Sequence, residues 1–148
     1  MNTQLSFLPE IDRKATQKNV ERYLETARIY KQIGFVRREI GNTPSYEYRE
    51  NGPTNKTSDP VADVAMWNVD HEKKIKELAE RVDWAVSKLS ARQMQIIQKR
   101  YLEHEDALDC ILYHELNMSK RTYEREKARA FYLLALMLKV EVIVEGVA

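Results

Sequence analysis

The sequence has little of what stabilises small secreted proteins, turn-rich sheets or membrane proteins. A single cysteine excludes an internal disulfide and is typical of a reducing cytosol. Only four glycines and four prolines interrupt 148 residues, which favours helices. No stretch reaches the roughly 18 apolar residues of a membrane span, and the first residues lack the basic start and apolar run of a secretory signal. We therefore expect a cytoplasmic protein without membrane contact.

The same scarcity extends to chemical motifs. There is no glycine-rich phosphate loop, and no serine or cysteine has a base partner at a recognisable spacing. Cys110 and His114 lie four residues apart, but a structural zinc site would need a second pair of ligands. We expect no enzyme activity, no metal and no cofactor.

What remains is the composition of a helical domain. Hydrophobic residues make up 43% of the chain, enough for a core, and charged residues make up 32%. The net charge is only +1, so attraction to nucleic acid would have to come from a local patch. We expect an all-α protein with long N-terminal helices in front of a smaller C-terminal helical domain.

Two long helices are predicted first. Apolar residues recur every three or four positions between about Pro9 and Ile33, within an N-terminal helical segment covering residues 1–40. Residues 41–60 hold two glycines and three prolines, so 41–59 are expected to form an exposed linker. Asp59 suits an N-cap before Pro60, and residues 60–89 are expected to form a long amphipathic helix. The expected apolar stripes are Val20, Tyr23, Leu24, Ala27 and Tyr30 in the first helix, and Ile75, Leu78, Ala79, Val82, Val86 and Leu89 in the second.

Three shorter helices are predicted in the domain of residues 90–139. Ser90 and Gln93 fit a capping box, which starts a helix reaching about Leu102. A second helix is expected from about Ala107 to Leu116, and Asn117 suits the left-handed position that ends it. Ser119 caps a third helix over 120–139, and residues 140–148 form a tail that could include a short strand. The residues expected to be buried are Met94, Ile97, Tyr101, Leu108, Ile111, Leu112, Leu116, Tyr123, Ala130, Phe131, Leu134, Ala135 and Leu138.

The last two of these helices, joined by a short turn, have the pattern of a helix-turn-helix, whose second helix enters the major groove of DNA. Between Lys120 and Lys139 six basic residues stand against two acidic ones, a net charge of +4 in a chain of +1. The competing interpretation is a solvated basic helix that touches no nucleic acid. The residues expected to bind DNA are Ser119, Lys120, Arg121, Thr122, Glu124, Arg125, Lys127 and Arg129.

The segments LSARQMQIIQKRYLE and ILYHELNMSKRTYEREKARAFYLLALML resemble the ArpU family of phage transcriptional regulators, which is itself similar to region four of bacterial sigma factors. The turn from Leu116 to Ser119 stands where the family carries Leu-Gly-x-Ser. Two positions depart from the family: Glu126 replaces an apolar residue, which suggests altered helix packing, and Leu133 replaces a basic one. The resemblance implies a phage or prophage regulator of late or lysis-related promoters, with double-stranded promoter DNA as its partner.

Two other functions stay open. The long helices could contact RNA polymerase without direct reading of DNA, or the chain could be a small DNA-packaging subunit, since phage packaging proteins also use small helix-turn-helix domains. The amphipathic helices are also suited to forming a homodimer.

Overall fold

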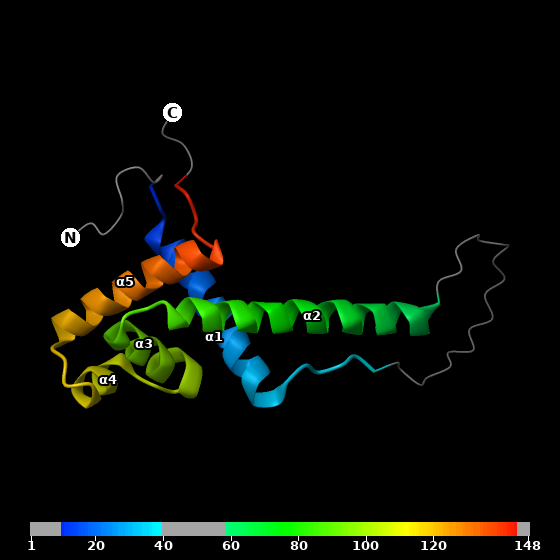
Figure 1. Cartoon of the computed structure of the whole chain (residues 1–148), viewed down its shortest axis with the longest axis horizontal. Helices are drawn as coiled ribbons and strands as arrows, with labels where there is room; N and C mark the ends of the chain where they lie inside the picture. The colour runs from blue at the N-terminus through cyan, green and yellow to red at the C-terminus, as the bar shows by residue number, and fades with distance from the viewer. Residues whose placement is uncertain (1–9, 40–58, 145–148) are drawn as a thin grey trace.

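The computed structural model describes residues 10–39 and 59–144, and this part of the chain is all-α as expected (Figure 1). The start of the expected first helix at Pro9, the linker up to residue 58 and the tail from residue 145 lie outside the described residues. The elements are α1 (Arg13–Ile33), α2 (Pro60–Ser87), α3 (Ala91–Ile97), the π-helical segment η1 (Gln98–Glu103), α4 (Asp109–Glu115) and α5 (Lys120–Leu138). No helix in the described ranges is long and apolar enough to cross a membrane.

Side-chain caps set the starts of both long helices. Asp12 accepts a hydrogen bond from the backbone N–H of Ala15 at 3.1 Å, so α1 begins at Arg13, four residues later than expected. Asp59 accepts hydrogen bonds from the amides of the first turn of α2, as predicted. Gly34 ends α1 with φ at +70°, a backbone conformation that disfavours residues with a Cβ.

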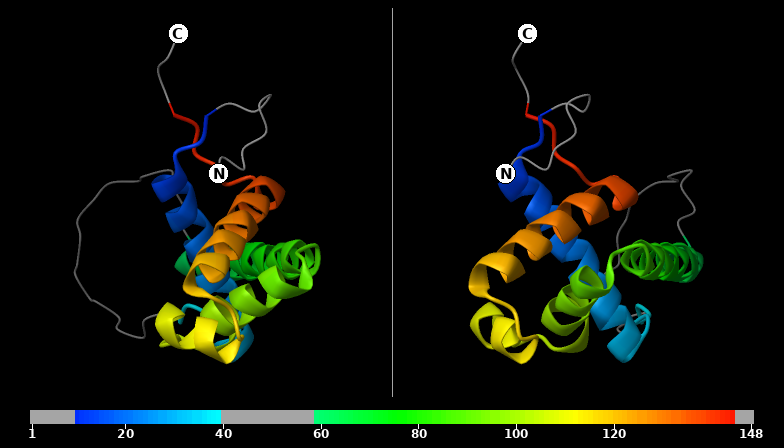
Figure 2. Two further views of the ribbon diagram at one scale, coloured as in Figure 1. Left: turned by 90° about the vertical axis from the view of Figure 1, so that its left-hand side faces the viewer. Right: turned by 60° about the vertical axis from the view of Figure 1, so that its left-hand side comes forward.

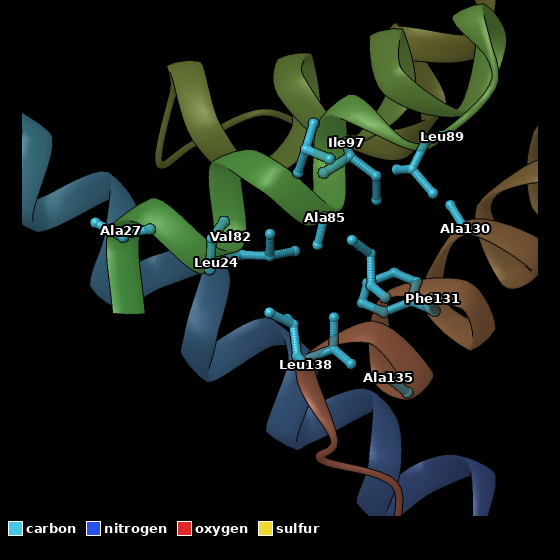
Figure 3. Close-up of a cluster of buried hydrophobic side chains, with 14 residues drawn as sticks. Leu24, Ala27, Val82, Ala85, Leu89, Ile97, Ala130, Phe131, Ala135 and Leu138 are labelled. Atoms are coloured by element: carbon cyan, nitrogen blue, oxygen red, sulfur yellow. The ribbon is translucent and has the colours of Figure 1, made fainter. Parts of the chain in front are cut away.

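One hydrophobic core joins the N-terminal helices to the C-terminal ones (Figure 3). The predicted stripe of α1 is buried at Val20, Leu24 and Ala27, whereas α2 is buried only from Ala79 onward. α5 packs against both α1 and α3, and η1 packs between α3 and α1; Figure 2 shows α4 at one end of this group. The predicted inward face of α5 is fully confirmed by Tyr123, Ala130, Phe131, Leu134, Ala135 and Leu138.

The helix after Ser90 begins as predicted and ends differently. Ser90 and Gln93 form the reciprocal capping box. After Ile97 the chain widens into the π-helical segment η1 instead of continuing as a regular α-helix. On η1, Tyr101 packs edge-on against Phe131 with ring centroids 5.4 Å apart and donates a hydrogen bond to Glu21 of α1 at 3.3 Å. η1 therefore connects the C-terminal helices to α1.

Two residues predicted to be buried are exposed. Leu108 is 55% exposed and Ile111 is 51% exposed, although both were expected in the core of the fourth helix. The reason is geometric, because α4 has only seven residues and presents one side to the neighbouring helices. Leu112 takes that side and is buried, Leu116 one turn later is half-buried, and Ile111 lies a quarter-turn away.

The residues that follow α5, 142–144, pair with the residues that precede α1, 10–12, and form no regular strand within the described part of the chain. Ile11 and Ile143 form one isolated antiparallel bridge. The amide of Asp12 donates to the carbonyl of Val142 at 2.8 Å, and the amide of Val142 donates to the Thr16 hydroxyl at 2.9 Å. This contact holds the start of α1 close to the end of α5.

Candidate nucleic-acid interface

A tight turn joins α4 to α5. Asn117 has φ at +52°, the left-handed conformation predicted for it, and the amide of Met118 donates to the carbonyl of Tyr113 at 2.9 Å. Ser119 accepts a hydrogen bond from the amide of Thr122 at 3.1 Å and caps α5, again as predicted. The two helices and this turn have the order of a helix-turn-helix.

A small apolar cluster fixes the angle between the two helices. Ile96 of α3, Leu112 of α4 and Tyr123 of α5 are buried together in it. Met118 packs against the same cluster, as expected for a hydrophobic staple with Tyr123. The inner side of the unit is therefore packed, and the outer side of α5 is available to solvent.

The exposed side of the first turns of α5 carries most of the predicted DNA-binding residues. Ser119, Lys120, Arg121, Glu124 and Arg125 are exposed, and Lys120 pairs with Glu124 at 4.0 Å. Arg121 and Arg125 lie one turn apart, and neither has a hydrogen bond or ion pair within the described part of the chain. Thr122 is half-buried, and its hydroxyl accepts a hydrogen bond from the Ser119 hydroxyl at 2.9 Å. This exposed cationic surface of residues 119–125 is called the α5 basic face below.

Lys127 does not belong to the α5 basic face. Its side chain is only 16% exposed, and its ammonium pairs with Asp109 of α4 at 3.0 Å. The ammonium also lies 5.5 Å from the centre of the Tyr101 ring, a cation–π contact. The structure therefore places Lys127, one of the residues expected to bind DNA, in an internal ion pair rather than on the exposed surface of α5.

Arg129 and Glu126 also belong to α5 and follow the α5 basic face along the helix. Arg129 pairs with Glu126 at 3.4 Å, so it sits at the rim of the α5 basic face. Glu126 also accepts a hydrogen bond from the Gln93 side-chain amide at 3.2 Å. A carboxylate can stand at a position where an apolar residue was expected because this polar contact connects α5 to the capping box of α3.

Sequence reasoning missed the polar network around Asp109. The Tyr123 hydroxyl donates to this carboxylate at 2.6 Å, the Lys127 ammonium at 3.0 Å and the Arg100 guanidinium at 3.2 Å. From the sequence, Tyr123 is expected only to be buried, and Asp109 has no predicted role. The sequence did contain a signal for this network. Asp109, Arg100 and Lys127 each lie within one helical turn of a residue predicted to be buried. The network connects η1, α4 and α5.

Ionisation follows from this arrangement. Burial acts to raise the pKa of Asp109, but hydrogen bonds from Tyr123 and Lys127, with the charges of Lys127 and Arg100, outweigh burial and lower that pKa. Burial, followed by the hydrogen bond to Asp109, raises the pKa of the Tyr123 phenol above its ordinary value. Asp109 is therefore an anion at neutral pH, and Tyr123 remains its protonated donor.

This network predicts a pH-dependent part of the folding stability. Because the pKa of Asp109 is lower in the folded chain, its stabilising effect is complete above about pH 5 and is lost as the pH falls below the unfolded value of about 3.9. The carboxylate is 44% exposed, so solvent screening limits the effect to about 1 kcal/mol. Urea unfolding from pH 7 to acid should show Asp109→Asn less stable than wild type at neutral pH, with the gap closing toward acid. Parallel stability curves would show that the network contributes nothing.

A groove of about 250 Å³ borders the α5 basic face on the side of α1. Its walls come from the start of α1 and from the α5 residues that follow the first turn, and the lining residues are Ile11, Arg13, Thr16, Gln17, Glu124, Lys127, Ala128, Phe131 and Tyr132. Beyond about residue 125, α5 is thus flanked by α1. Residues 120–125 form the N-terminal part of α5, the part that a recognition helix uses to contact bases.

Comparisons with known proteins add no constraint to this geometry. The chain matches no protein-family profile, no curated protein and no solved structure, so its resemblance to the ArpU family stays an expectation.

Proposed function

We propose that this chain is a sequence-specific, DNA-binding transcriptional regulator with α5 as its recognition helix. The observation that carries the proposal is the α5 basic face, where Arg121 and Arg125 are exposed at the start of a capped helix and have no hydrogen bond or ion pair with residues 10–39 or 59–144. An arginine fork binds the O6 and N7 atoms of guanine through two hydrogen bonds. Two such forks spaced one helical turn apart are suited to reading neighbouring base pairs.

The other residues of the α5 basic face fit supporting roles. Lys120 lies at the first position of α5, next to the cap, where backbone amides and the helix dipole also favour a phosphate. Glu124 pairs with Lys120 in the free protein and could accept a hydrogen bond from the N4 amino group of cytosine. Its charge also repels phosphate, which favours contact with base edges over non-specific binding along the backbone.

The resemblance to the ArpU family narrows the proposed biology. It favours a phage or prophage regulator acting at late or lysis-related promoters.

The proposal can be tested without knowing the operator. Duplexes containing a random core are selected by binding to the full chain, and an enriched duplex is then used in gel shifts with excess non-specific competitor. We expect a defined motif, and an affinity that falls with salt at a log–log slope of about −0.9 for each phosphate neutralised. Selection that enriches no motif, with shifts abolished by competitor, would contradict sequence-specific reading.

A second candidate function, contact with RNA polymerase or another protein, is favoured by a separate observation. A groove of about 500 Å³ runs between the end of η1 and α4, and the exposed Leu108 and Ile111 lie in it. Four carboxylates line the same groove and only one of them, Glu115, is paired with a lysine of the lining, Lys99 at 3.9 Å, which suits a basic protein segment with an apolar anchor. No residue of α5 lines this groove, so the two functions could coexist. The acidic lining residues are Glu103, Glu105, Asp106 and Glu115.

A further inference from the structure

The first half of α2 extends away from the hydrophobic core (Figure 1). α2 has 28 residues, and its buried residues are all found from Ala79 onward. A helix of this length spans about 42 Å, so about half of it has no packed core beneath it. Helices of this kind usually owe their stability to packing of an apolar face, which raises the question of what this half packs against.

One side of this half is covered by the chain that follows α1. Trp67 stacks on His71 with ring centroids 3.9 Å apart and lies 3.6 Å from the Arg38 guanidinium. Asn68 forms two hydrogen bonds with the backbone of Arg38, at 2.8 and 3.2 Å. Arg37 and Glu72 form an ion pair at 3.5 Å. All of these contacts lie on one side of α2, the side that carries Trp67, His71 and Glu72.

A different side of the same half is apolar and exposed. Val61, Met66 and Val69 are 53%, 66% and 65% exposed. Ala62 and Ala65 are exposed as well. Ala62, Ala65, Met66 and Val69 follow the spacing of three, four and seven that places side chains on one helix face. Together the five residues are called the α2 stripe, and no described element covers it.

We infer that the α2 stripe is the contact surface for a second copy of this chain, with the two α2 helices antiparallel. The charges on either side of the stripe favour this partner. Asp59 and Asp63 lie at its N-terminal end, and Lys73 and Lys76 lie beyond its C-terminal end. An antiparallel pair that sets Met66 of one chain opposite Val69 of the other brings Asp59 opposite Lys76 and Asp63 within one position of Lys73. A parallel pair would set like charges side by side.

The composition of the α2 stripe also suits a self-complementary contact. The two alanines allow the helix axes to come close, while Met66 and Val69 fill the space between them. In a two-fold antiparallel pair the same residues serve both chains. The C-terminal ends of the two α2 helices then point away from each other, which places one helix-turn-helix unit at each end of the dimer.

Sedimentation velocity on the full chain without DNA tests the inference, and its outcome does not depend on the proposed DNA binding. The α2 stripe is small, so we expect a monomer–dimer equilibrium with a dissociation constant of roughly 1–100 µM. Met66→Glu should shift this equilibrium to the monomer, weakening association at least tenfold. The matched control, Ile33→Glu, changes an apolar residue at the end of α1 that is 60% exposed, against 66% for Met66, and should leave dimerisation unchanged. A wild-type monomer at all concentrations, or a dimer lost in Ile33→Glu but retained in Met66→Glu, would overturn the inference.

Charge reversal tests the antiparallel orientation. Lys73→Glu with Lys76→Glu should weaken the dimer, because each new carboxylate would face Asp59 or Asp63 of the other chain. Adding Asp63→Lys to that variant should restore part of the affinity. A dimer strengthened by the lysine reversal alone, or unaffected by any of these changes, would contradict the antiparallel arrangement.

Discussion

Replacing Arg121 and Arg125 together by alanine is expected to abolish sequence-specific DNA binding while leaving the fold intact. Both side chains are exposed and make no hydrogen bond or ion pair in the described structure, so their loss removes no internal contact. An arginine that reads a base contributes about 1–3 kcal/mol. Loss of both should therefore weaken binding to the selected duplex by roughly 100-fold or more, measured by gel shift or fluorescence anisotropy.

Two further variants separate base reading from general charge. Arg121→Lys with Arg125→Lys keeps both charges but removes the planar fork, so it should lose preference for the selected duplex while still binding DNA non-specifically. Lys74→Ala with Lys88→Ala removes two exposed charges that belong neither to the α5 basic face nor to the α2 stripe and its flanking charges, and it should bind like wild type. If that control lost as much affinity as the double arginine variant, the effect would reflect total charge rather than the α5 basic face.

The largest effect on stability is expected at Tyr123. Its side chain is only 1% exposed, packs with Ile96 and Leu112, and donates a hydrogen bond to Asp109. Tyr123→Ala would leave a cavity between α3, α4 and α5 and would remove one hydrogen-bond donor to Asp109. We expect it to lower the free energy of unfolding by about 3–5 kcal/mol. Urea unfolding measures this cost directly.

Tyr123→Phe separates the two contributions of this side chain. Phenylalanine keeps the ring in the cluster but cannot donate to Asp109, which still has Lys127 and Arg100 as donors. A loss of about 1 kcal/mol is expected. Truncating a buried aromatic side chain to alanine normally costs more than this. If Tyr123→Ala also lowered the free energy of unfolding by less than about 1 kcal/mol, α4 and α5 would not be packed together through Tyr123.

Local features of this fold could be predicted from the sequence. The capping box at Ser90, the cap at Ser119 and the left-handed Asn117 depend on residues no more than four positions apart. The inward faces of α1 and α5 follow from helical spacing alone. The exposed positions of Arg121 and Arg125 follow in turn, because these residues lie off the predicted inward face of α5.

Features that depend on how separate helices meet could not be predicted. Lys127 and Arg125 lie on the same helix, and both are basic. The neighbouring sequence does not show that Lys127 forms an ion pair with Asp109, 18 residues earlier. Leu108 and Ile111 have the spacing of a core face, but α4 is too short to be covered on two sides. In each case the outcome is decided by the position of α4 against η1 and α5.

The central claim is that the α5 basic face enters a DNA groove, and an NMR titration of the ¹⁵N-labelled chain with the selected duplex tests it most directly. Backbone amide signals of residues 119–125 should shift or broaden on addition of DNA, while those of the buried end of α5, at Leu134 and Leu138, should move little. Changes confined to α2 or to the Leu108–Ile111 groove, with residues 119–125 unaffected, would contradict the claim.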